Sequence, residues 1–130
     1  MIRAVMALEH KNADQALELL RVAKPYELSA SSPIPLGPIY FRAQAYVTLH
    51  DGSAALSEFQ KILDHPGVMA RNASPAVGPL VRLGLARAFA LQGDAAKARA
   101  AYENFLTLWK DADPDIPILK QAKAEYAKLQ

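Results

Sequence analysis

Histidine is the side chain in this sequence best suited to metal binding or to general-base chemistry near neutral pH. There are three histidines, His10, His50 and His65, and each falls at the end of an expected helix. No two of them have the i, i+4 spacing that places two metal ligands on one helical face. We therefore expect no metal site and no catalytic site, only histidines that interact with the partial negative charge of helix C-termini.

An aspartate triplet, Asp111, Asp113 and Asp115, matches the first ligands of a calcium-binding loop. That loop also requires a glycine and a bidentate glutamate, at positions that Ile116 and Ala122 occupy here. The triplet is therefore predicted to form a turn in which an aspartate caps the following helix.

The aromatic residues Trp109 and Tyr126, together with the lysines of the last predicted helix, could in principle stack on bases and bind phosphates. The formal net charge of +2 is small for a nucleic-acid partner, and Glu125 lies among those lysines. We expect a solvated helix that covers a core tryptophan instead. The chain has no cysteine, so disulfides and thiol chemistry are excluded.

Length and composition indicate one folded domain. The chain has 130 residues, of which 52% are hydrophobic, enough for one continuous core. It contains no signal-peptide core and no apolar run that approaches the roughly 18 residues of a membrane span. A cytoplasmic protein without membrane insertion and without a cofactor is expected.

The stretch 80–109 shows most clearly the structural element that would position the residues discussed above. Leu83, Ala86 and Phe89 recur at helical spacing, and Gly93 followed by Asp94 ends one helix and caps the next. A second apolar stripe follows after this turn. It consists of Ala98, Tyr102, Phe105 and Leu106. The stretch is therefore predicted to be a helical hairpin.

The same pattern occurs twice more, which predicts an all-α stack. Hairpins are expected at about 1–25, 38–66 and 75–110, with a capping helix at about 115–129 and proline-rich connectors at 26–38 and 67–79. Asn12 or Asp14 could cap the second helix of the first hairpin, and Asp51 or Ser53 that of the second. The second and third hairpins correspond through the pairs Ala43 and Ala86, Tyr46 and Phe89, Asp51 and Asp94, Ala55 and Ala98, and Phe59 and Tyr102.

In the third hairpin, Leu85-Ala86, Phe89, Ala98 and Tyr102 stand where a tetratricopeptide repeat has leucine and a small residue, an aromatic, alanine and an aromatic. The chain therefore resembles the tetratricopeptide family, although the connectors lengthen its period of about 34 residues. The C-terminal stretch 85–129 and the segment EFQKILDHPG also resemble the tetratricopeptide region that follows the catalytic domain in acidobacterial-type eukaryotic-like serine/threonine kinases. No Gly-rich loop, His-Arg-Asp or Asp-Phe-Gly of a kinase is present in this chain.

The resemblance implies a superhelix of three hairpins whose concave face binds a peptide or a partner protein. The family's groove positions fall here on Val5, Leu8, Glu9, Tyr40, Gln44, Val47, Thr48, Leu83, Arg87 and Leu91. Tyr40 and Arg87 are the expected anchors, because aromatic and arginine side chains dominate recognition energy. Family members that grip a terminal carboxylate have a lysine and an asparagine where this chain has Tyr40 and Gln44, so a peptide segment or a helix is the expected ligand.

The expected function is that of a non-catalytic protein-interaction module, as the C-terminal part of a bacterial signalling kinase. The alternative is homo-oligomerisation, or a structural domain of a bacterial regulator with a DNA-binding N-terminus. An enzymatic role is not expected, because no nucleophile, base and orienting group fall together in the sequence.

Overall fold

The computed structural model describes residues 2–22, 24–26, 36–66 and 77–129. In these residues all regular structure is helical, which confirms the predicted all-α class. The α-helices are α1 (Ile2–Glu9), α2 (Ala13–Arg21), α3 (Gly37–Thr48), α4 (Gly52–Leu63), α6 (Val77–Leu91), α7 (Ala95–Leu108) and α8 (Pro117–Ala127), and a short 3-10 helix, η1, spans Lys24–Tyr26. The connectors predicted at 26–38 and 67–79 lie largely outside the described residues.

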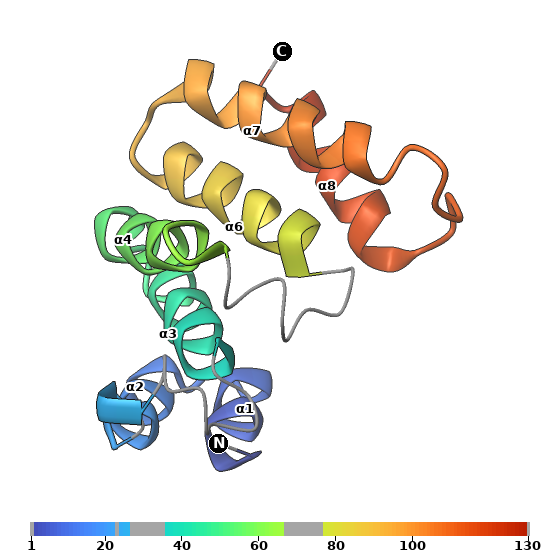
Figure 1. The fold of residues 1–130 in the computed structure, drawn as a ribbon. Coiled ribbons are helices and arrows are strands. Elements are labelled where there is room, and N and C mark those ends of the chain that lie inside the picture. Colours follow the sequence, from blue (N-terminus) through green and yellow to red (C-terminus); the bar gives the residue numbers. More distant parts are fainter. Residues whose placement is uncertain (1, 23, 27–35, 67–76, 130) are drawn as a thin grey trace.

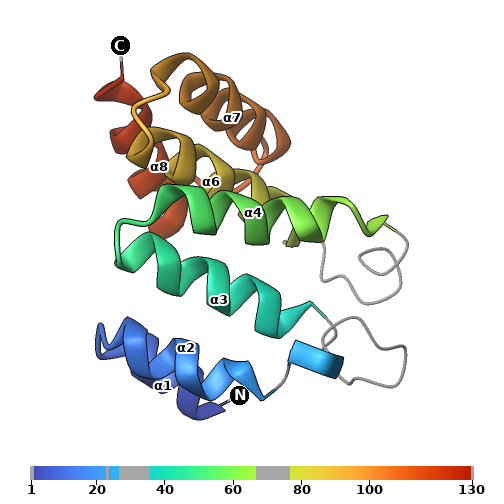
Figure 2. The ribbon, with the colours of Figure 1, turned by 90° about the vertical axis from the view of Figure 1, so that its left-hand side faces the viewer.

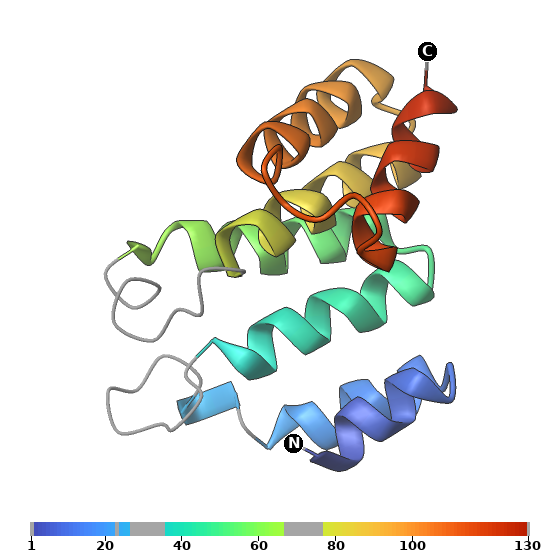
Figure 3. The same cartoon turned by 90° about the vertical axis from the view of Figure 1, so that its right-hand side faces the viewer.

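The helices form a stack of hairpins that runs in one direction from the first to the last (Figures 1 and 2). Within each hairpin the two helices pack on each other, α1 on α2, α3 on α4 and α6 on α7. Between hairpins, α2 packs on α3 and α4 packs on α6, while the first helices α1, α3 and α6 also contact in series. The last helix, α8, packs on α7 and runs alongside α6 and α7 (Figure 3).

The three hairpin turns share one geometry. In each turn the second residue after the first helix has a positive φ angle, 58° at Lys11, 59° at His50 and 79° at Gly93. The next residue caps the second helix with its side-chain oxygen, which accepts a backbone N–H bond three residues later. These capping bonds are Asn12 to Gln15 (3.2 Å), Asp51 to Ala54 (3.0 Å) and Asp94 to Lys97 (3.1 Å). The predicted turn at Gly93-Asp94 is confirmed, and the caps of the other two hairpins are Asn12 and Asp51.

The core consists of three clusters that follow the stack. The first hairpin contributes small residues that pack against α3, the middle cluster joins α3, α4 and α6, and the last joins α6, α7 and α8. The predicted apolar stripes are confirmed, because Ala55, Phe59, Ala98 and Phe105 are all fully buried. The alanines let the helix backbones approach while the aromatic rings fill the space between them.

Helix α6 is buried on two faces, although the sequence predicted one apolar stripe. Val81 and Leu85 belong to the middle cluster, and Leu83 and Ala86 belong to the last cluster. The helix is therefore covered by α4 on one side and by α7 and α8 on the other. This double burial makes α6 the central element of the fold.

Candidate binding groove

A groove of about 940 Å³ opens where the C-terminal halves of α3 and α6 meet α8. It extends to the first turn through Lys11 and to the second turn through His50. Its lining residues are Lys11, Gln44, Val47, Thr48, His50, Arg87, Ala90, Leu91, Tyr102, Gln121, Glu125, Lys128 and Leu129. The groove is therefore assembled from segments that are far apart in the sequence, and only the stacking of the hairpins creates it.

The centre of the groove is an ion pair between Arg87 of α6 and Glu125 of α8. Arg87 Nε lies 3.0 Å from Glu125 Oε1 and 3.3 Å from Oε2, and Arg87 Nη2 lies 3.2 Å from Oε2. The two side chains are 21% and 35% exposed. The paired hydrogen bonds fix the guanidinium plane and hold α8 over the end of α6.

Two tyrosines complete this polar centre. Burial, with a smaller contribution from the charge of Glu125, raises the pKa of Tyr102 to about 12, and Arg87 opposes the shift. The pKa of Tyr40 is also raised, mainly by burial, while a hydrogen bond with Gln44 and the charge of Arg87 act against the rise. Arg87 therefore joins α6 to α8 beside Tyr102, and both phenols are protonated at neutral pH.

The structure brings half of the predicted groove residues together. Gln44, Val47, Thr48, Arg87 and Leu91 all line the groove. They lie on α3 and α6, one turn from one another along the same side of each helix.

The other predicted residues lie elsewhere. Tyr40 is half-buried behind the groove, where its ring packs edge-on against Phe59 at 6.1 Å between centroids. Leu8 packs against the small core of the first hairpin and Glu9 is exposed, while the side chain of Val5 lies outside the described residues.

Leu83 requires a correction. It was predicted to face a ligand, but it is 1% exposed and lies in the last cluster, because α7 and α8 cover that face of α6. It therefore supports the groove from behind and does not line it.

Most of the lining residues that sequence reasoning missed come from the turns and from the last helix. His50 had been placed at a helix end, Tyr102 in the core, and Glu125 with the lysines of the last helix on a solvated surface, yet these residues line the groove together with Lys11. The available signal was the position of Lys11 and His50 directly before the capping residue, where the third turn has Gly93. Both residues have a positive φ angle in the structure, and this conformation often has a functional reason in a non-glycine residue.

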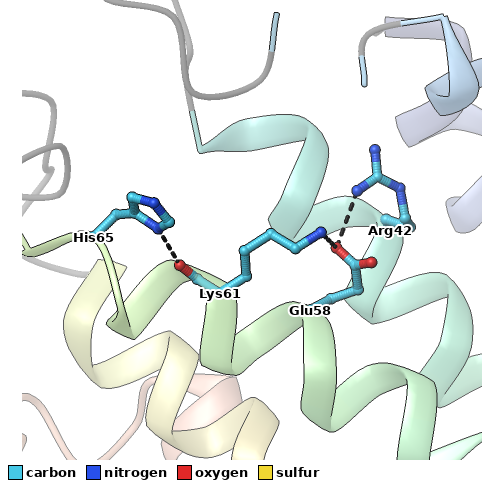
Figure 4. Close-up of polar contacts among 4 residues, drawn as sticks. All are labelled: Arg42, Glu58, Lys61 and His65. Carbon is cyan, nitrogen blue, oxygen red and sulfur yellow. Dashed lines mark hydrogen bonds and ion pairs between the residues drawn. The ribbon is translucent and has the colours of Figure 1, made fainter. Parts of the chain in front are cut away.

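A second polar cluster joins α3 and α4 away from the groove (Figure 4). Arg42 Nη1 lies 3.0 Å from Glu58 Oε2, and Lys61 Nζ lies 3.4 Å from the same oxygen. The Arg42 and Glu58 side chains are only 6% and 12% exposed. The structure therefore buries Arg42 in this ion pair, although arginine side chains are mostly exposed in proteins.

The residues with potential for metal chemistry have structural contacts. The Nδ1 atoms of His10 and His65 bond to the carbonyl oxygens of Met6 and Lys61 at 2.7 and 2.8 Å, four residues earlier, which satisfies helix C-termini. Among the described residues, no group of three or more histidine, aspartate or glutamate side chains is placed to hold a metal ion. Nor does this part of the chain contain a helix of the length and hydropathy needed to cross a membrane.

The aspartate triplet forms a turn, as predicted, but does not cap the helix that follows. Asp113 Oδ1 accepts the backbone N–H of Asp115 at 2.9 Å. The N-cap of α8 is Ile116, whose side chain makes no capping bond, with a proline in the first turn of the helix. The prediction of an N-cap aspartate was therefore wrong, because proline starts the helix after the turn.

Comparison with known proteins adds no family assignment to this geometry, since no family model, curated protein or solved structure matches the chain.

Proposed function

We propose that this chain is a non-catalytic protein-interaction module of the tetratricopeptide type, which binds a peptide segment of a partner protein in the groove between α3, α6 and α8. The observation that supports the proposal most directly is the groove itself, which lies along the first helices of successive hairpins. Its volume of about 940 Å³ falls in the range of ligand pockets in proteins.

The chemistry of the groove favours recognition. Val47, Leu91 and Leu129 supply apolar area, and Gln44 and Gln121 add hydrogen-bonding groups at the edge. At the centre, Arg87 and Glu125 satisfy each other and fix α8 in place. Such a combination of apolar floor, polar rim and rigid support is typical of peptide-binding surfaces.

Selection from a random peptide display library on the immobilised full chain tests this proposal. The discriminating variant is Leu91→Asp, since Leu91 lines the groove and is 38% exposed. Leu108→Asp is the matched control, because Leu108 is another exposed leucine near the end of a helix, 51% exposed, and is not among the groove residues. The proposal is supported by peptides that bind the original chain and Leu108→Asp but no longer bind Leu91→Asp. Peptides that tolerate both substitutions, or no enriched peptides at all, contradict it.

Self-association is a second candidate function, which the outer surface of the first hairpin favours. Met6 and Val22 are 51% and 75% exposed there, and apolar side chains at the end of a stack are available to a second copy. Light scattering over a range of concentrations tests this alternative. A mass that stays monomeric throughout excludes it.

The cellular context is proposed from the sequence resemblance. A module of this kind would follow the catalytic domain of a bacterial signalling kinase, or form part of a bacterial regulator, in the cytoplasm. Reading the genomic frame upstream of Met1 tests the placement, because a kinase-coding segment in frame supports it and a stop codon contradicts it.

A further inference from the structure

We infer that the segment bound in the groove is acidic, with carboxylates that face the rim formed by Lys11, His50 and Lys128 and with apolar residues that lie on the floor. This inference rests on the proposed function and specifies its partner. All three rim residues are exposed and line the groove. In the described part of the chain, neither lysine of this rim has an ion-pair partner.

The groove contains one carboxylate, and it is already engaged. Among the lining residues only Glu125 is acidic, and three contacts of 3.0 to 3.3 Å tie it to Arg87. Arg87 and Glu125 neutralise each other, so the formal charge that remains comes from Lys11 and Lys128. A partner with carboxylates would supply the missing negative charge.

The hydrogen-bond acceptors at the nearby helix ends are also occupied. At the end of α3, the carbonyl oxygens of Tyr46 and Val47 accept from the N–H groups of Asp51 and His50, at 2.9 and 3.0 Å. At the end of α6, the carbonyl oxygens of Phe89 and Ala90 accept hydrogen bonds from the backbone N–H groups of Asp94 and Gly93. These turn bonds reduce the partial negative charge that helix C-termini present. The rim therefore offers mainly donors to a ligand.

The apolar residues that line the groove indicate that the bound segment also needs apolar side chains. Val47, Ala90, Leu91 and Leu129 contribute apolar side chains to the same lining as the charged rim residues. A segment in which acidic and apolar residues alternate can place carboxylates on the rim while its apolar side chains cover the floor.

Nucleic acid fits this surface less well. The aromatic residue in the lining, Tyr102, is 2% exposed and cannot stack on a base. Two lysines and one histidine are also few for a phosphate backbone, whose binding usually involves several cationic contacts.

Fluorescence anisotropy with the full chain tests the inference. The probes are two labelled peptide pools of equal length and equal apolar content, with Asp and Glu at the polar positions of one pool and Lys and Arg at those of the other. A labelled single-stranded oligothymidylate is the third probe. The charge-reversal variant is Lys11→Glu/Lys128→Glu. The matched control is Lys110→Glu/Lys123→Glu, which makes the same charge change in a separate hollow beside Trp109.

We expect the acidic pool to bind and the basic pool not to bind. The Lys11/Lys128 variant should bind the acidic pool about tenfold more weakly, and the Lys110/Lys123 variant should bind it like the original chain. Added salt should weaken the binding of the acidic pool, because the rim charges are exposed.

Three results would each overturn the inference. The chain could prefer the basic pool or the oligonucleotide, the acidic pool could fail to bind, or the Lys11/Lys128 and Lys110/Lys123 variants could lose the same amount of affinity for the acidic pool. The display experiment separates this failure from failure of the proposed function. If display still yields neutral or basic peptides that depend on Leu91, the proposed function stands and only the acidic partner is rejected.

Discussion

At the scale of single residues, the ion pair between Arg42 and Glu58 has the largest expected effect on stability. Both side chains are nearly buried between α3 and α4, with 3.0 Å between their charged atoms. Removing one partner from a buried pair costs about 3 to 5 kcal/mol, because the other charge loses its compensation. Glu58→Leu should therefore lower the free energy of unfolding by about that amount, measured by urea denaturation.

The matched variant is Arg42→Met/Glu58→Leu, which replaces both charges with apolar side chains. Replacement of a whole buried pair is often close to neutral, so the double variant should regain most of the stability that Glu58→Leu loses. If the single and double variants are equally unstable, burial of the Arg42 charge is not the cause of the loss.

Tyr102 provides a test in alkaline solution. Because burial raises its pKa to about 12, from about 10 in the unfolded chain, the unfolded state loses this proton first as the pH rises. The stability that depends on the protonated phenol is complete below pH 10 and is lost as the pH approaches 12. Relative to Tyr102→Phe, the original chain should therefore lose free energy of unfolding between pH 10 and 12. A constant difference across that range would contradict the raised pKa.

At the scale of the helices, the contact between α4 and α6 depends on Gly84. A methyl group added at Gly84 would overlap with the ring of Phe59, which is fully buried and cannot move aside. Gly84→Ala should therefore lower the free energy of unfolding by about 1 to 3 kcal/mol through overpacking. Gly78, in the same helix, is the control, since an added methyl group there meets no atom of another helix within 4 Å.

Gly78→Ala should change the free energy of unfolding by about 1 kcal/mol or less, because the better helix propensity of alanine is opposed by the contact of its Cβ with the ring of Pro79. Equal effects of the two substitutions in thermal or urea unfolding would contradict the close packing of Phe59 on Gly84.

The helices also show which features the sequence could predict. Caps such as Asp94 and the positive φ angle at Gly93 depend on neighbours within a few residues, so local rules identified them. The stripe with Leu83 and Ala86 followed from periodicity, but the second buried face of α6, with Val81 and Leu85, depends on where α4 packs, which no local pattern specifies.

The groove was predicted in part for the same reason. Gln44, Val47 and Arg87 followed from the position of the first helices in each hairpin, and the structure places them together. Glu125 was missed because its partner, Arg87, lies on a different helix far along the chain. Periodicity identifies the apolar face of a helix, but it does not show which polar residue meets a distant one.

At the scale of the whole molecule, α8 both covers one side of α6 and α7 and forms one wall of the groove. Its fully buried residues are Leu119 and Ala122. Three polar contacts add to these, Arg87 with Glu125, Arg99 with the carbonyl of Leu129 at 3.0 Å, and Tyr126 with Glu103 at 2.8 Å. By contrast, α6 is covered by apolar contacts on two faces. The wall is therefore held by weaker and more exposed interactions than the centre of the fold.

Local opening follows such differences in burial, and amide hydrogen exchange measures it directly. We expect the amides of α8 to exchange faster than those of α6, and added salt to speed exchange in α8 while α6 changes little, because salt screens the partly exposed ion pair that ties Glu125 of α8 to Arg87. Arg87→Met should produce a similar increase in α8 without added salt, and should reduce its salt dependence. If α8 and α6 exchange at the same rate in all these conditions, α8 opens only with the whole molecule, and the groove has a fixed wall.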